Sequence, residues 1–102
     1  MRPKVSDLNV RGIIWIEEFV EKLARKHGVG REEVRQVLRD RKTKYRFVEK
    51  GHERGEDVYA ALGRTRAGRE LIVFFVRKRD SRALVVSART MSEAEKKRYE
   101  AK

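Results

Sequence analysis

The sequence predicts an α+β domain in which two N-terminal helices pack on an antiparallel sheet of about four strands and a short helix ends the chain. Two largely apolar runs, residues 71–76 and 84–89, have the length and composition of strands. Two stretches with helical periodicity precede them, and short polar turns separate the later strands. Because such turns join antiparallel neighbours, the later strands are expected to run antiparallel. The length of 102 residues suits one domain, 1–102.

The first half of the chain predicts one strand and a pair of helices. Residues 10–15 contain Ile13, Ile14 and Trp15 and predict a short first strand. A helix follows and ends at Gly28, whose position after the periodic residues is typical of a left-handed C-terminal cap. Its apolar face is expected to consist of Ile16, Phe19, Val20, Leu23, Ala24 and His27.

A second helix is expected to begin immediately afterwards. Gly30 can serve as its N-cap, and Glu32 and Glu33 fall in the first turn, where negative charge is favourable. Val29 can pack on Val34 as a hydrophobic staple. The buried face of this helix is expected to consist of Val34, Val37 and Leu38. The short connection between the helices therefore predicts a tight helical pair.

The second half of the chain predicts the rest of the sheet and a last helix. Tyr45 and Phe47 alternate with basic residues, as in a half-exposed strand. Ser92 and Glu95 match a capping box, which predicts a final helix over 93–101. Further strands are expected at 58–64, 70–76 and 82–89, with a polar loop at 49–57 and turns at 66–68 and 78–81.

The net charge of +11 favours a polyanionic partner. Eight basic and two acidic residues lie within 61–90, so more than half of the excess falls in one segment of the predicted sheet. We therefore expect one basic face that attracts RNA or DNA at long range. A solvated surface that only keeps the protein soluble is the alternative.

Several functional classes are disfavoured. The chain has no cysteine, which excludes disulfides and thiolate metal sites and fits a reducing cytoplasm. It contains no His-Glu-x-x-His motif and no aspartate cluster, so neither a metal nor a cofactor is expected. No apolar stretch approaches the roughly 20 residues that span a bilayer, and no secretory signal is recognisable. We expect a cytoplasmic protein without a membrane partner.

The chain contains four short motifs in order: Arg25-Lys26-His27-Gly28-Val29, Gly63-Arg64, Val86-Ser87-Ala88-Arg89 and Lys97-Arg98-Tyr99-Glu100. Together they resemble the BrnT family. The resemblance covers nearly all of the predicted domain, from about residue 10 to residue 101. BrnT proteins are ribonuclease toxins of bacterial and archaeal toxin–antitoxin pairs and have a RelE-like fold.

The resemblance implies a target, a partner and an activity. The target is RNA, the activity is metal-independent endoribonuclease cleavage, and the partner is a cognate ribbon-helix-helix antitoxin of the BrnA type. Because that antitoxin dimerises, the resemblance implies a 2:2 complex. A non-catalytic module that binds RNA or DNA on the same fold, a degenerate toxin, is the alternative function.

Arginines are the expected phosphate ligands. The planar guanidinium group matches phosphate oxygens and stays charged, so it can stabilise the transition state of RNA cleavage. Arg64 and Arg89 each end an apolar strand and are the leading phosphate clamps. This role requires that the two groups converge and that neither is held by a carboxylate, since a surface ion pair is the alternative for both. Arg66 and Arg69 flank a turn and are expected to contact the RNA backbone or to be solvated.

Proton transfer has fewer candidates. His27 and His52 are the only histidines, and histidine titrates nearest to neutral pH. His27 can equally stabilise a helix C-terminus, and the resemblance, which places a Lys-His pair here, implicates Lys26 together with it. His52 can swing over bound RNA or remain a solvated loop residue. Tyr99 can donate a proton or stack on a base, or it can anchor its helix; Trp15 is a base-stacking candidate or a core residue.

Overall fold

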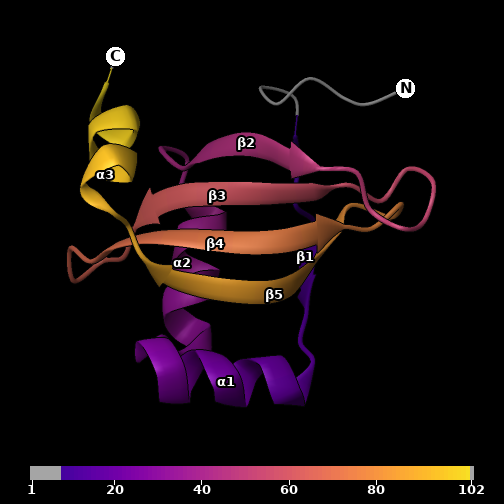
Figure 1. The fold of residues 1–102 in the computed structure, drawn as a ribbon, viewed down its shortest axis with the longest axis horizontal. Coiled ribbons are helices and arrows are strands. Elements are labelled where there is room, and N and C mark those ends of the chain that lie inside the picture. The colour runs from indigo at the N-terminus through magenta and orange to yellow at the C-terminus, as the bar shows by residue number, and fades with distance from the viewer. Residues whose placement is uncertain (1–7, 102) are drawn as a thin grey trace.

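The computed structural model describes residues 8–101. The predicted α+β class is confirmed, since two helices precede most of the sheet and one helix follows it (Figure 1). The elements in chain order are β1 (Gly12–Ile14), α1 (Glu17–His27), α2 (Arg31–Arg39), β2 (Lys44–Glu49), β3 (Val58–Arg64), β4 (Glu70–Arg77), β5 (Arg82–Thr90) and α3 (Glu93–Glu100).

The sheet has five strands in the order β1-β5-β4-β3-β2. The four later strands pair antiparallel with one another, as their short connections predict. β1 instead pairs in parallel with β5, with Gly12 opposite Arg82 and Ile14 opposite Leu84. The predicted antiparallel sheet of about four strands is therefore present as β2 to β5, and the parallel strand β1 makes it a mixed sheet of five. Both helices and three strands separate β1 from β5, so no hairpin turn fixes their relative direction.

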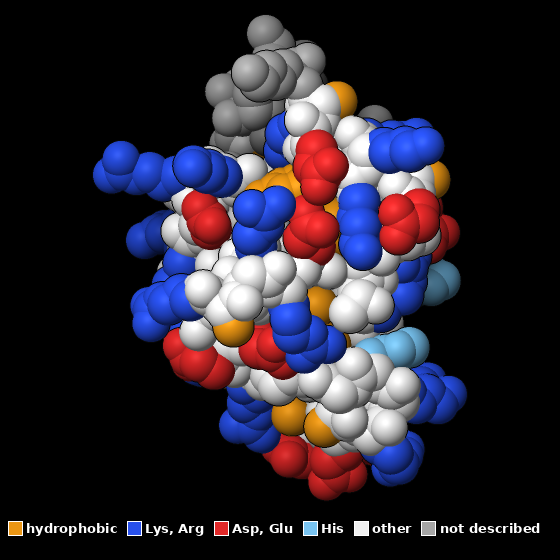
Figure 2. Space-filling model, turned by 90° about the vertical axis from the view of Figure 1, so that its left-hand side faces the viewer, with side chains coloured by type: hydrophobic (Ala, Val, Ile, Leu, Met, Phe, Trp, Pro, Cys, Tyr) orange, Lys and Arg blue, Asp and Glu red, His pale blue; other side chains and the backbone are white. Residues whose placement is uncertain are grey.

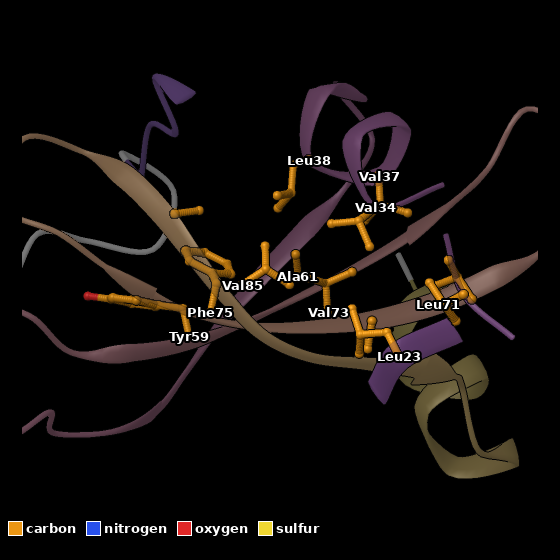
Figure 3. Close-up of a cluster of buried hydrophobic side chains, with 13 residues drawn as sticks. Leu23, Val34, Val37, Leu38, Tyr59, Ala61, Leu71, Val73, Phe75 and Val85 are labelled. Atoms are coloured by element: carbon orange, nitrogen blue, oxygen red, sulfur yellow. The ribbon is translucent and has the colours of Figure 1, made fainter. Parts of the chain in front are cut away.

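The main core lies between α2, α1 and one face of the sheet. Alternate residues of each strand point to this face, as the two-residue period of a strand requires. The rings of Tyr59 and Phe75 stack at 6.1 Å between centroids. Figure 3 shows sheet residues meeting those of the helices. The buried members include Leu23, Val34, Val37, Leu38, Ala61, Leu71, Val73 and Val85.

The first helix is less buried than its apolar pattern predicts. Leu23 is its only buried residue, whereas Ile16 is 36% exposed, and Ala24 and His27 are also exposed. α1 packs mainly against β5, so only a narrow line of its side chains meets the sheet. His27, which its spacing places on the apolar face, is thus exposed in the last turn of α1. The predicted cap is confirmed, since Gly28 has a φ of 61° and its N–H donates to the Ala24 carbonyl at 3.1 Å.

The predicted ends of the other helices are also confirmed. Gly30 is the N-cap of α2, and its N–H donates to Glu33 Oε1 at 3.2 Å. At the start of α3 the Ser92 N–H donates to Glu95 Oε1 at 2.8 Å, and the Glu95 N–H donates to Ser92 Oγ at 3.2 Å. This is the expected capping box. It fixes the direction in which α3 leaves the sheet.

The opposite face of the sheet carries a second, smaller apolar cluster, and α3 covers one end of it. Its buried residues are Ala60, Leu62, Ile72 and Met91. Phe74 and Tyr99 pack against these residues, so Tyr99, which belongs to α3, anchors this helix to the sheet. Within residues 8–101, no helix has the length and apolarity needed to cross a membrane.

Candidate nucleic-acid interface

A groove of about 390 Å³ opens at the end of the sheet where β3 stops. The polar face of α2 forms one wall, and the end of β3 and the side of α3 form the others. We call it the α2–α3 groove. Its lining contains five cationic side chains, one tyrosine and the carboxylates of Glu32 and Asp40. The cations and the tyrosine are Arg35, Arg39, Lys42, Arg64, Arg66 and Tyr99.

Figure 2 shows this end of the molecule, with lysine and arginine side chains interspersed with aspartates and glutamates. The surface is therefore not uniformly basic. Arg35, for example, donates to Glu32 at 2.7 Å, although the Glu32 side chain is 62% exposed. Exposed pairs of this kind are weak and are readily replaced by a phosphate.

Arg64, the last residue of β3, lines the groove. Its guanidinium group stands 5.9 Å from the centre of the Tyr99 ring and donates to Glu70 Oε2 at 2.9 Å. The hydrogen bond with Glu70 raises the pKa of Arg64, so the side chain keeps its charge. Half of the side chain remains exposed. Arg64 thus presents a fixed positive charge to the groove.

Two cations, Arg64 and Lys44, lie close to the Tyr99 ring. Lys44 Nζ lies 5.8 Å from the ring centre, and the same lysine donates to the carbonyl of Ala101. Tyr99 also lines a shallower groove of about 460 Å³ that runs from Arg64 toward Lys44. The tyrosine therefore anchors α3 and also lines a basic groove. Its role in base stacking or proton donation stays a prediction.

Arg89 is placed differently from Arg64. It lies opposite Ile72 on β4, and Arg64 lies opposite Glu70, so the two arginines share one face of the sheet. However, Arg89 does not line the α2–α3 groove. It donates to both oxygens of Glu95, at 2.7 and 2.9 Å. These hydrogen bonds lower the pKa of Glu95 to about 2.

Both leading arginines are therefore in ion pairs, and the requirement that neither is held by a carboxylate is not met. The two pairs differ in kind. The Arg64 pair is a single hydrogen bond at the rim of the groove, whereas Arg89 makes a two-hydrogen-bond pair that ties β5 to α3. A phosphate can more easily displace the first pair than the second.

Arg66 and Arg69 also differ from each other in their contacts. The exposed side chain of Arg66 lines the groove, and its backbone N–H donates to Gln36 Oε1 at 2.9 Å. Arg69 donates to both oxygens of Glu33 at 2.8 Å and to the Gly28 carbonyl at 3.0 Å. It therefore ties the β3–β4 turn to the junction of α1 and α2 and does not line the groove.

The two histidines lie at different ends of the molecule. Lys26 and His27 are exposed in the last turn of α1, at the same end as the β3–β4 turn and α3, but neither lines the groove. His52 lies in the β2–β3 loop, at the opposite end of the sheet. The structure therefore brings Lys26 and His27, but not His52, to the end that carries Arg64.

Trp15 lies between β1 and α1 and packs partly buried against the main core. The guanidinium groups of Arg31 and Arg35 stand 5.9 and 5.8 Å from the ring centre. Trp15 is therefore a core residue on one side and a neighbour of α2 arginines on the other. It does not line the α2–α3 groove.

The sequence interpretation missed the basic face of α2. Arg31, Arg35 and Arg39 recur every four residues, a spacing that places them on one side of a helix. That periodicity is visible in the sequence and could have identified them. Lys42 follows just after the helix and lines the same groove.

The expectation of one basic face built from residues 61–90 is wrong. Arg64, Arg66, Arg69 and Arg89 lie at the α3 end of the sheet, whereas residues 77–82 lie at the other end. Each strand of a hairpin runs from one end of the sheet to the other, so the basic residues that flank a strand lie at opposite ends of the sheet. Among the described residues, no group of three or more histidines, aspartates or glutamates is placed to hold a metal ion.

Comparisons with known proteins identify the family. A family model described as ribonuclease toxin, BrnT, of type II toxin-antitoxin system matches residues 15–95. The crystal structure of the Brucella abortus ribonuclease toxin BrnT has a TM-score of 0.59 and 21% sequence identity, covering 80% of this chain and 97% of that chain. The search of curated proteins gives no significant match. The family match spans most of the chain, and the fold agrees with it; the protein therefore belongs to the BrnT family of ribonuclease toxins of type II toxin–antitoxin systems.

Proposed function

We propose that the protein is an endoribonuclease toxin that cleaves RNA in the α2–α3 groove without a metal ion. One observation carries this proposal: five cationic side chains from α2, its C-terminal loop and the end of β3 gather with Tyr99 around one groove. Family membership supports an RNA substrate. The groove supplies the positive charge that a phosphate needs and an aromatic ring on which a base can stack.

The proposed reaction is an in-line transesterification. The ribose 2′-oxygen attacks phosphorus and loses its proton to a base, while the bond from phosphorus to the 5′-oxygen breaks and that oxygen gains a proton. The products are a 2′,3′-cyclic phosphate and a 5′-hydroxyl. Negative charge builds up on the phosphorane in the transition state, so a fixed cation beside it lowers the barrier.

We assign that cation to Arg64, with Arg66 beside it. The pair between Arg64 and Glu70 leaves half of the Arg64 side chain exposed, and such pairs are worth little. A phosphate that enters the groove can therefore take over the outer donors of the guanidinium group while Glu70 still orients it. The centre of the Tyr99 ring lies 5.9 Å from the guanidinium group of Arg64, and Tyr99 is assigned to stack on a base or to protonate the leaving oxygen.

Arg89 is assigned a positioning role rather than a direct phosphate contact. Its pair with Glu95 holds the first turn of α3 against β5, and Tyr99 follows one helical turn later. Loss of Arg89 is therefore expected to lower activity through a displaced Tyr99. If Arg89 instead contacted the phosphate directly, as predicted from the sequence, the cleavage activity would survive Glu95→Gln. This variant therefore distinguishes the two roles.

We assign proton transfer from the 2′-hydroxyl to a carboxylate that lines the groove, Glu32 or Asp40. His27 and Lys26, which lie at the same end of the molecule but outside the groove, are the alternative. Histidine is the side chain best suited to exchange a proton near neutral pH, and His27 directly precedes the cap that leads into α2. Glu32→Gln or Asp40→Asn is expected to lower the cleavage rate, and His27→Ala is expected to leave it close to wild type. The opposite result would assign the base to His27.

A cognate antitoxin is expected from the family. We propose that a BrnA-like ribbon-helix-helix antitoxin covers the α2–α3 groove and forms a 2:2 complex with the toxin. Adding such an antitoxin should stop RNA cleavage in proportion to the amount bound.

The test is a cleavage assay with purified protein and an RNA oligonucleotide in EDTA. We expect fragments with 2′,3′-cyclic phosphate and 5′-hydroxyl ends, because the chemistry needs no metal. Arg79→Gln, which removes one arginine at the far end of the sheet, should cleave at the wild-type rate. Binding without cleavage would instead support a non-catalytic RNA- or DNA-binding module.

A further inference from the structure

A second groove, of about 240 Å³, lies on the other side of α2. Residues 10–13 of the β1 segment and Trp15 form one wall, and the side chains of Arg35, Leu38 and Arg39 form the other. We call it the Trp15 groove. Arg35 and Arg39 line both this groove and the α2–α3 groove. The polar face of α2 is therefore a ridge between two neighbouring hollows.

The charged side chains that line the Trp15 groove are all cationic. Arg11, Arg35 and Arg39 line it, and among the described residues no carboxylate does. The α2–α3 groove, by contrast, includes Glu32 and Asp40. The volume of the Trp15 groove is below the roughly 300–1,000 Å³ of sites that enclose a drug-sized ligand. The Trp15 groove therefore suits one nucleotide of an anionic chain better than a separate metabolite.

The tryptophan itself is held in place but not sealed off. Packing against the main core fixes one part of the ring, while Arg31 and Arg35 stand over it. Both arginines reach it from solvent, with side chains 45% and 32% exposed. Each is also paired at 2.7 Å with an exposed glutamate of α1 or α2, and such pairs are weak. An approaching phosphate can draw either guanidinium group away and leave the ring free for a base.

The spacing of the ridge fits a nucleic-acid strand. Arg35 and Arg39 lie four residues apart on α2, which is about 6 Å along the helix axis. This is comparable to the separation of successive phosphates in an extended strand. Two neighbouring phosphates can thus meet one arginine each, and the base on the far side of the ridge reaches Trp15.

We propose that single-stranded RNA crosses the α2 ridge, with backbone phosphates on Arg35 and Arg39 and a flanking base stacked on Trp15. The inference rests on the proposed function, because it takes the α2–α3 groove to hold the phosphate that is cleaved. It adds a subsite outside that groove and a preference for unpaired RNA. A base inside a duplex is already stacked on both faces and cannot stack on Trp15.

The protein contains one tryptophan, so its fluorescence reports on this subsite alone. The probe is a 12-nucleotide 2′-O-methyl RNA, which cannot be cleaved because the attacking hydroxyl is blocked. We expect the single strand to quench Trp15 fluorescence to saturation and the blunt duplex of the same sequence to leave it nearly unchanged. Binding of the single strand without quenching would overturn the inference, as would equal quenching by the duplex.

Variants give an independent readout by fluorescence anisotropy with a labelled single strand. Trp15→Ala should weaken binding about 5- to 100-fold, the loss expected for one stacked base, and Trp15→Phe should restore most of it. Arg39→Gln should reduce the slope of log affinity against log salt by about 1, whereas Arg79→Gln should not change it. Wild-type affinity for Trp15→Ala would also overturn the inference. If that variant does not fold, the wild-type quenching experiment still decides.

The two proposals fail separately. Lack of cleavage of unmodified RNA argues against the proposed function but does not affect quenching by the blocked strand. A fluorescence change that only the antitoxin produces would assign the Trp15 groove to the protein partner and would overturn the RNA subsite.

Discussion

Arginines of this protein differ in their partners rather than in their sequence context. Arg64 and Arg66 lie at the groove with much of their side chains exposed. Arg69 and Arg89 each bind both oxygens of one glutamate and connect separate elements. One residue type thus supplies both the RNA-facing charge and the ties that fix the elements around it. A strand-end position alone does not separate these two roles.

The pair between Arg89 and Glu95 predicts a specific dependence of stability on pH. The pKa of Glu95 is lowered from 4.5 to about 2 in the folded protein by hydrogen bonds from Arg89. Because the folded value is the lower one, the stabilisation is complete above pH 4.5 and is lost as the pH falls toward 2. The free energy of unfolding of wild type minus that of Glu95→Gln should therefore increase from pH 2 to pH 4.5 and then level off.

Glu93→Gln is the matched control for this measurement. The Glu93 side chain is 86% exposed, and its nearest lysine nitrogen is 3.6 Å away. The free energy of unfolding of wild type minus that of Glu93→Gln should stay nearly constant over the same pH range. A flat difference for Glu95→Gln as well would contradict a tight pair with Arg89.

Arg69→Gln should destabilise the protein although it does not line the groove. The change removes both hydrogen bonds to Glu33 and the one to Gly28. Because the pair is partly exposed, we expect a loss of only about 1 kcal/mol in the free energy of unfolding. Urea denaturation measures it, with Arg66→Gln expected to stay within about 0.5 kcal/mol of wild type. Equal stability of the two variants would show that Arg69 is not a structural tie.

At the level of elements, local signals predicted the helices well. Gly28 and the Ser92–Glu95 box mark their termini in the sequence because capping depends on residues within one turn. The parallel pairing of β1 with β5 was not predictable in this way, because its partners are about 70 residues apart. The exposure of His27 was missed for a similar reason: periodicity identifies a face but not how far along the helix the sheet extends.

The candidate site combines elements distant in sequence, which limited its prediction. Arg64, Arg66 and Tyr99 could be selected because each ends or follows a recognisable element. Arg35 and Arg39 were overlooked because basic residues on the polar face of an amphipathic helix are ordinarily solvated. Only the approach of α2 to the end of β3 gives them a common groove.

That approach depends on Gly63. A Cβ atom at this position would collide with Thr43 Oγ1 and lie 3.0 Å from Val37 Cγ1 of α2. Gly63→Ala should therefore lower the free energy of unfolding by about 1–3 kcal/mol through overpacking. Chemical denaturation measures the effect.

Gly12→Ala is the control for the effect of an added methyl group. Its Cβ would find Arg82 Cγ at an ordinary 3.6 Å. We expect a change within about 0.5 kcal/mol. Equal losses at Gly63 and Gly12 would contradict close contact between β3 and α2.

For the whole molecule, the distribution of charge matters more than the net charge of +11. The hairpins place basic residues at both ends of the sheet, and many of them are paired with carboxylates. What distinguishes the α3 end is the addition of arginines from α2 to those of β3. RNA is therefore expected to bind at that end.

This placement predicts the salt dependence of RNA binding. If the five cations of the α2–α3 groove contact phosphates, the slope of log affinity against log salt should be about −3 to −4 for single-stranded RNA. Lys78→Gln, at the far end of the sheet, should leave that slope unchanged. A slope that falls equally for Lys78→Gln and Lys42→Gln would show diffuse binding over the whole surface.

The most direct test is the single-turnover rate of RNA cleavage by Arg64→Gln at saturating enzyme. We predict a rate about 100- to 1,000-fold below wild type, the usual loss when one group that stabilises transition-state charge is removed. Arg64→Lys should recover only part of it, because an ammonium group lacks the planar pair of donors. With a folded variant confirmed by its melting temperature, a wild-type rate for Arg64→Gln would contradict cleavage in the α2–α3 groove.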